Sequence, residues 1–155
     1  MTAFVRRTPG SLWLTVGGWL SIAAAVAHLA AIAGGGDWYR FFGAGEAMAS
    51  AAERGSPVPV LLTLGIATVL GIWATYAFSG AGRIRRLPLL RTGLVVISAV
   101  YLLRGSVLFM PAALGRQDLS PAFIFWSSAI VLVYGLAYAI GTWRAWPNLT
   151  KKEFA

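Results

Sequence analysis

The stretch LWLTVGGWLSIAAAVAHLAAIA, residues 12–33, decides the fold, because it contains no Asp, Glu, Lys or Arg and consists mainly of apolar and small side chains. The hydrocarbon core of a bilayer takes a helix of about 20 such residues. Within lipid the backbone must satisfy its own hydrogen bonds, and a helix does so internally. Residues 12–33 therefore predict a membrane-spanning helix.

Three further apolar runs of similar length lie at residues 58–78, 87–110 and 121–142. Each begins beside a proline, which suits the first turn of a helix because that turn needs no backbone N–H. The chain of 155 residues is 58% hydrophobic and only 12% charged, whereas soluble domains are about one-quarter charged. The sequence predicts an all-α integral membrane four-helix bundle that forms one domain over residues 1–155.

Basic residues collect in alternate loops of this predicted arrangement. They precede the first span, separate the second from the third, and follow the fourth: Arg6, Arg7; Arg83, Arg85, Arg86; Arg144, Lys151 and Lys152. The other two loops carry acids as well as bases. The positive-inside rule then puts both termini in the cytoplasm. The same rule accounts for the net charge of +8 without a nucleic-acid partner.

Several chemistries are disfavoured by what the sequence lacks. The chain has no cysteine and one histidine, His28. This removes disulfides and thiol catalysis, and it leaves too few ligands for haem or zinc. The predicted spans contain no Asp or Glu, which counts against a small proton-coupled exporter. We expect no metal and no cofactor.

Each predicted span carries a polar side chain about 8–10 Å from its outer end, at the helical rise of ~1.5 Å per residue. These side chains are His28, Thr63, Arg104, Ser127 and Ser128. Tyr101 precedes Arg104 by three positions, so the two share a helix face. Ionisable groups in a span usually face the helix bundle or water. We therefore expect an outward-facing polar pocket lined by His28, Tyr101 and Arg104.

Each of these residues also has a purely structural interpretation. Arg104 could extend to the lipid headgroups, as we expect of Arg91 near the opposite end of the same span. His28 could be a neutral core histidine with one hydrogen bond. If Arg104 instead faces inward, it requires a carboxylate. The candidates on that side are Asp37, Glu46, Glu53 and Asp118.

The segment GGGDWYRFFGAGE, residues 34–46, would cover this pocket. Glycines 34–36 are expected to end the first span, and DWYRFF to lie at the membrane interface. Its polar and aromatic side chains complete the expected ligand-binding set: Asp37, Tyr39, Arg40 and Glu46. Asp37 and Glu46 are the candidate partners of Arg104 or His28. The alternative is an interfacial anchor that re-enters the membrane.

The following residues, GEAMASAAER at positions 45–54, have strongly helix-forming composition. They predict a short amphipathic helix on the outer surface, between the first and second spans. In this helix Met48 and Ala52 would share an apolar face. Glu46, Ser50 and Glu53 would point to water.

The stretches DWYRFFGAGE at 37–46 and YLLRG at 101–105 resemble a group of uncharacterised small four-span membrane proteins of proteobacteria, over nearly the whole chain. The layout, with PLLR at 88–91, is more remotely similar to DoxX-like four-helix membrane proteins. The resemblance implies a multi-pass protein of the bacterial inner (cytoplasmic) membrane. It implies no activity.

Three functional hypotheses remain. The first is binding of a small amphipathic ligand, quinone or lipid-like, in the outward-facing pocket. The second is a structural or accessory subunit that binds other membrane proteins or a second copy of itself. The third is an enzyme acting on a lipid or isoprenoid, with His28 and an acid as the proton-transfer pair. The sequence identifies no catalytic residue.

Overall fold

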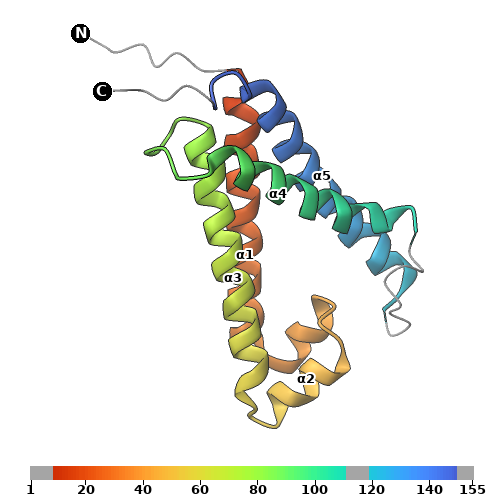
Figure 1. Ribbon diagram of the computed structural model, residues 1–155. Helices are drawn as coiled ribbons and strands as arrows, with labels where there is room; N and C mark the ends of the chain where they lie inside the picture. Colours follow the sequence, from red (N-terminus) through yellow and green to blue (C-terminus); the bar gives the residue numbers. More distant parts are fainter. Residues whose placement is uncertain (1–8, 111–118, 150–155) are drawn as a thin grey trace.

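The computed structural model describes residues 9–110 and 119–149, and every element in these ranges is a helix. The basic residues expected to flank the outermost spans, Arg6, Arg7, Lys151 and Lys152, lie outside the described residues, as does Asp118. The elements are α1 (Ser11–Phe41), α2 (Glu46–Glu53), α3 (Pro57–Gly80), α4 (Leu90–Gly105), the short 3-10 helix η1 (Ser106–Leu108) and α5 (Pro121–Ala145) (Figure 1).

Four of these helices are long and apolar enough to cross a membrane: α1, α3, α4 continued through η1, and α5. Their outward surfaces carry large apolar side chains, with Leu61, Leu103 and Val133 exposed by 64%, 75% and 56%. Such continuous apolar surface is unfavourable in water and suits lipid. The helices identify the chain as a multi-pass membrane protein and confirm the four spans expected from the sequence.

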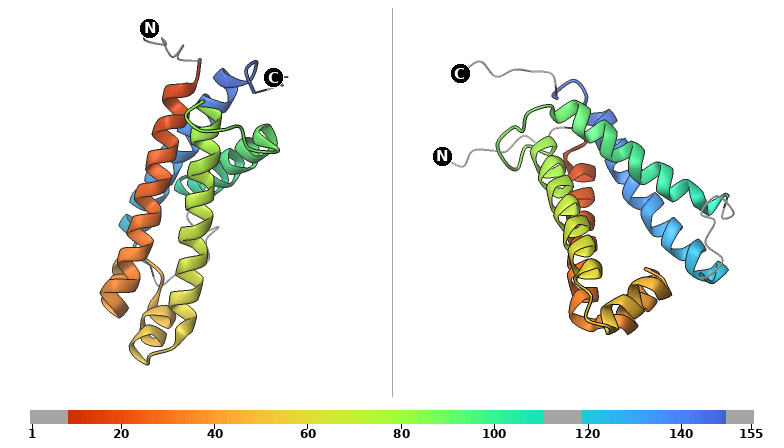
Figure 2. Two further views of the ribbon diagram at one scale, coloured as in Figure 1. Left: turned by 90° about the vertical axis from the view of Figure 1, so that its left-hand side faces the viewer. Right: turned by 60° about the horizontal axis from the view of Figure 1, so that its bottom comes forward.

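The four spanning helices form two antiparallel pairs, α1 with α3 and α4 with α5 (Figures 1 and 2). The pairs meet where α1 begins and α5 ends, and they diverge towards α2 (Figure 2). At the meeting point Leu14 packs directly on Gly141, where an added Cβ would lie 2.8 Å from the Leu14 side chain. We call this the basic end, because it carries Arg83, Arg85, Arg86, Arg91 and Arg144; the opposite end is the α2 end.

Side-chain hydroxyls connect the two pairs within the core. Tyr138 donates to the backbone carbonyl of Trp73 at 3.1 Å. Ser21 Oγ lies 2.8 Å from the Tyr138 hydroxyl and 2.9 Å from the Tyr101 hydroxyl. Because Tyr138 has already used its only proton, Ser21 must donate to Tyr138 and accept from Tyr101. This hydroxyl chain therefore runs in one direction, from Tyr101 through Ser21 and Tyr138 to Trp73, and it joins α4, α1, α5 and α3.

The end of α1 differs from the sequence prediction. Glycines 34–36 were expected to end the helix, but helical structure resumes after them and continues to Phe41. The interruption is confined to Gly35, with φ 69° and ψ −152°. A residue with a Cβ would be strained there, whereas glycine adopts this conformation readily. The chain therefore bends and keeps helical geometry for Tyr39 and Arg40.

The short helix predicted at 45–54 is confirmed as α2, but the centre of its buried face is Ala49, which the sequence did not single out. Ala49 is completely buried against Ala31 and Tyr39. Met48 is only half-buried, whereas Ala52 does pack on this cluster. The face that packs on α1 is therefore centred on the smallest side chain, which lets the two helix backbones approach closely.

The hydroxyl chain predicts the effect of Ser21→Ala. The substitution removes the acceptor of Tyr101 and the donor to Tyr138, so it should lower the free energy of unfolding in detergent by about 1–2 kcal/mol. Thermal or denaturant unfolding of the purified protein measures this. Ser106→Ala is the matched control, because Ser106 is exposed and donates only to the Leu103 carbonyl of its own helix. Equal stability of the two variants would contradict the role of Ser21.

Candidate functional site

A single arginine holds all three acids of the described chain at the α2 end. Arg40 donates from Nε and Nη2 to the two oxygens of Glu46, each at 2.8 Å. Its Nη1 donates to Glu53 at 2.5 Å and to Asp37 at 3.2 Å. The paired contact with Glu46 is the bidentate geometry in which a guanidinium binds a carboxylate most strongly. This Arg40 cluster fastens α2 to the last turns of α1.

The Arg40 cluster favours the ionised forms of Glu46 and Glu53. Hydrogen bonds from Arg40, and secondarily from Ser50, lower the pKa of Glu46 to about 2. Arg40 likewise lowers the pKa of Glu53 from its ordinary value. With three carboxylates around one guanidinium, the cluster is net negative at neutral pH. It therefore offers no unpaired cation to a ligand.

Apolar packing supports these ion pairs from beneath. Tyr39 is buried under α2 and accepts a hydrogen bond from Thr63 of α3 at 3.3 Å. Gly36 lies directly beneath Glu53, where an added Cβ would meet the carboxylate at 2.5 Å. The bend at Gly35 thus brings Arg40 over α2, and α2 is positioned by both α1 and α3.

Arg104 lies on the other helix pair and binds hydroxyls. Its Nη1 donates to Ser128 at 2.9 Å and its Nη2 reaches Ser127 at 3.5 Å, both on α5. The partnership expected with Asp37 or Glu46 is therefore wrong, because Arg40 binds those acids on the α1–α3 pair. Within residues 9–110 and 119–149, no carboxylate contacts Arg104. The side chain is half-buried between α4 and α5.

His28 lies on α1, one turn after Ala24. Its Nδ1 is 2.7 Å from the Ala24 carbonyl oxygen. A carbonyl can only accept, so Nδ1 carries a proton, and in the neutral ring Nε2 has a free lone pair. The hydrogen bond matches the core-histidine interpretation, while the half-buried ring keeps an acceptor available.

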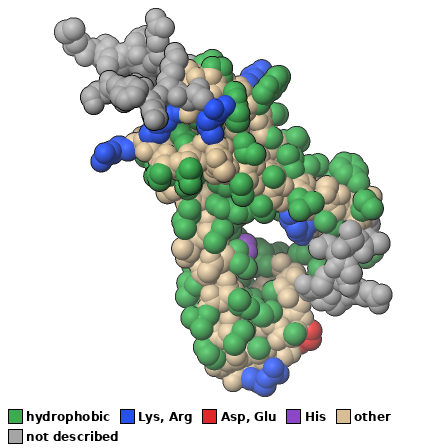
Figure 3. Space-filling model, viewed as in Figure 1, with side chains coloured by type: hydrophobic (Ala, Val, Ile, Leu, Met, Phe, Trp, Pro, Cys, Tyr) green, Lys and Arg blue, Asp and Glu red, His purple; other side chains and the backbone are tan. Residues whose placement is uncertain are grey.

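A hollow separates the two helix pairs at the α2 end (Figure 3). The histidine side chain is visible at its inner edge, and a basic side chain of the α4–α5 pair borders its opposite side. Arg104 is the basic residue of α4 at this end. We call the space between His28 and Arg104 the interpair hollow. Near the α2 end, the ring of Phe123 from α5 meets the backbone at Gly43, where any side chain would overlap the ring.

The expected site residues therefore separate into three groups. Asp37, Tyr39, Arg40 and Glu46 come together at α2. Tyr101 is not at the pocket surface, because its hydroxyl donates into the core and its ring packs on Trp73 and Tyr138. His28 and Arg104 lie on opposite sides of the interpair hollow. The sequence provided no signal for the contact of Phe123 with Gly43, because one more aromatic in an apolar span is unremarkable.

Neither a protein-family model, nor a curated protein, nor a solved structure matches this chain.

The ion pairs of the Arg40 cluster predict that α2 detaches in acid. When α2 is docked, the pKa of Glu46 lies below its ordinary value of 4.5, at about 2. The ion pair with Arg40 therefore stabilises the docked state above pH 4.5, and this stabilisation is lost as the pH falls towards the pKa of the docked state. Because the chain has no native cysteine, spin labels at Ala47→Cys and Leu61→Cys can report the distance from α2 to α3. We expect a narrow distance distribution at pH 7 and a broad one near pH 2–3.

Two variants control this measurement. Arg40→Gln should broaden the distribution at both pH values, because it removes the partner of all three acids. Arg54→Gln, an exposed arginine outside the hydrogen-bonded cluster, should behave like the parent. A distribution that stays narrow in acid would show that apolar packing alone docks α2.

Proposed function

We propose that the protein binds a small amphipathic molecule, quinone or lipid-like, in the interpair hollow. The observation that carries this proposal is the half-buried guanidinium of Arg104, which no carboxylate of the described chain neutralises. Cations inside a membrane span are costly and usually serve a partner or a substrate. An anionic or carbonyl-bearing ligand would supply the missing partner.

The two serines orient the guanidinium of Arg104 for ligand binding. Ser127 and Ser128 hold one side of the guanidinium, while its planar fork keeps further N–H groups for a ligand. Ser127 in turn donates to the Ile124 carbonyl at 3.3 Å, which fixes its oxygen as an acceptor for Arg104. A planar donor held in this way favours carboxylate, phosphate or carbonyl oxygens.

On the opposite side of the interpair hollow, His28 supplies a hydrogen-bond acceptor instead of a cation. With Nδ1 donating to Ala24, the free Nε2 can accept from a ligand hydroxyl. The spans around the hollow are apolar, so the remainder of the ligand should be apolar as well. This combination favours an amphipathic molecule over a small hydrophilic ion.

We also propose an orientation, with the basic end in the cytoplasm and α2 outside. The described arginines of the α3–α4 loop and of the ends of α4 and α5 support it, because basic residues are retained on the cytoplasmic side. The three described acids all lie at the α2 end. The bacterial inner membrane, implied by the sequence resemblance, is part of the same proposal.

Single cysteines test this orientation in intact cells. A membrane-impermeant maleimide should label Ala47→Cys on α2 and should label Arg85→Cys only after the cells are opened, because both positions are exposed. The reverse pattern would invert the topology and place the interpair hollow on the cytoplasmic side.

Small molecules that co-purify in mild detergent test the binding proposal. Mass spectrometry should find a stoichiometric compound with the parent protein and lose it in Arg104→Ala. Arg54→Ala removes the same charge from an exposed position and should retain the compound. Arg104→Lys should bind more weakly than the parent, because an ammonium cannot form the bidentate contact.

Two outcomes would contradict ligand binding. One is a parent protein that carries no compound. The other is an Arg104→Ala variant that retains it in full. If a partner protein co-purifies instead, the accessory-subunit hypothesis would replace the proposal, with the interpair hollow as the place for a partner helix.

A further inference from the structure

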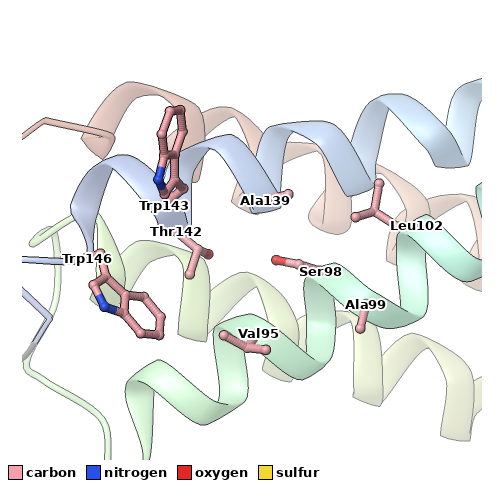
Figure 4. Close-up of a pocket in the computed structure, with 8 residues that line it drawn as sticks. All are labelled: Val95, Ser98, Ala99, Leu102, Ala139, Thr142, Trp143 and Trp146. Atoms are coloured by element: carbon pink, nitrogen blue, oxygen red, sulfur yellow. The ribbon is translucent and has the colours of Figure 1, made fainter.

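A second cavity lies near the basic end, on the α4–α5 pair and away from the interpair hollow. It is an open groove of about 580 Å³ between the two helices. Figure 4 shows Trp143 and Trp146 at one end of the groove and Leu102 at the other, with the hydroxyls of Ser98 and Thr142 pointing towards one another between them. We call it the α4–α5 groove. It shares no residue with the proposed site at Arg104.

The groove contains a hydroxyl without a partner. Thr142 is 4% exposed, and its Oγ1 makes no hydrogen bond within the described chain. A helical threonine ordinarily bonds to a carbonyl one turn earlier, as Ser98 does with Leu94 at 2.7 Å. Burying an unsatisfied hydroxyl is unfavourable. A groove occupant with an oxygen acceptor would satisfy this hydroxyl (Figure 4).

A cation lies beside the tryptophan end of the groove. The guanidinium of Arg91 stacks over the Trp146 ring, with Cζ 3.8 Å from the ring centroid. Its Nε is buried and lacks a hydrogen-bond partner in the described chain. This stacking holds the Arg91 guanidinium against the end of α5 at the basic end. The described acids cannot neutralise it, because all three are bound by Arg40 at the α2 end.

The remaining groove is apolar and follows the helix axis. Val95, Ala99 and Leu102 line the α4 side, facing Ala139 on α5. From Val95 to Leu102 the helix advances about 10 Å, at ~1.5 Å per residue. That length suits several methylene groups of an acyl chain, and a free inorganic anion would leave it empty.

We propose that the α4–α5 groove binds one anionic phospholipid. The phosphate lies near Arg91 and Trp146, at the basic end of the groove. The Thr142 hydroxyl donates to an ester or phosphate oxygen. One acyl chain follows the apolar wall towards Leu102. The groove thus combines a cation, an unsatisfied donor and an apolar channel in the order in which a phospholipid presents its headgroup, esters and chain.

Lipid retention measured by native mass spectrometry tests this. The purified protein is incubated with phosphatidylglycerol or with phosphatidylcholine of identical acyl chains, and inorganic phosphate is added as a competitor. We expect phosphatidylglycerol to bind about fivefold more tightly than phosphatidylcholine, the factor for one arginine near anionic lipid. Inorganic phosphate should not displace it.

Three variants assign the binding to the groove. Arg91→Gln should abolish the preference for phosphatidylglycerol. Thr142→Val, which has the same shape without the hydroxyl, should weaken retention of both lipids by severalfold and should fold normally, because it removes an unsatisfied polar atom. Arg144→Gln, an exposed charge at the same helix end but outside the groove, should retain the preference.

The proposal is overturned if both lipids are retained equally, if phosphate displaces the lipid, or if Arg144→Gln reduces the preference as much as Arg91→Gln. It is also overturned if Thr142→Val, with an unfolding temperature at or above that of the parent, retains lipid as the parent does. Arg91→Gln should still carry the compound that co-purifies through Arg104, which separates the groove from the proposed ligand site at the α2 end.

Discussion

The hydroxyl chain of Tyr101, Ser21 and Tyr138, which ends on the Trp73 carbonyl, is the contact on which the arrangement of the spans depends. Within lipid, apolar surface does not drive helices together, because hydrocarbon solvates it as well as a neighbouring helix does. Close packing and hydrogen bonds between helices must provide the association. The hydroxyl chain contains one residue from each spanning helix. It therefore fixes the α1–α3 pair relative to the α4–α5 pair at a single level along the helices.

The two ends of the molecule differ because the helices diverge from that level. Towards the basic end the pairs converge, with Leu14 seated on Gly141, and the arginines there have no described acid beside them. Towards the α2 end they separate, and the α1–α3 pair is completed by α2 while the α4–α5 pair keeps Arg104. Acids and bases are therefore distributed unequally: Arg40 is paired with all three described acids, and no other described arginine forms an ion pair with them.

The sequence predicted the features that depend on composition and local period. Four apolar runs became four spanning helices, and the alanine-rich stretch after Gly45 became α2. It also singled out Arg104 and His28, because ionisable groups in a span are rare. The sequence could not predict which acid binds which arginine, because that depends on the backbone angles of Gly35, which turn Arg40 over α2. The stacking of Arg91 on Trp146 likewise requires two segments far apart in sequence to meet.

The hydroxyl chain also has a consequence for proton movement. Proton conduction along hydroxyls requires each oxygen to receive a proton from one neighbour and to release one to the other. Every hydroxyl then points in the opposite direction. Tyr138 ends on a backbone carbonyl, which has no proton to give and cannot pass one on. The hydroxyl chain is therefore a fixed electrical dipole inside the membrane, oriented from Tyr101 towards Trp73. It cannot pass a proton beyond Tyr138.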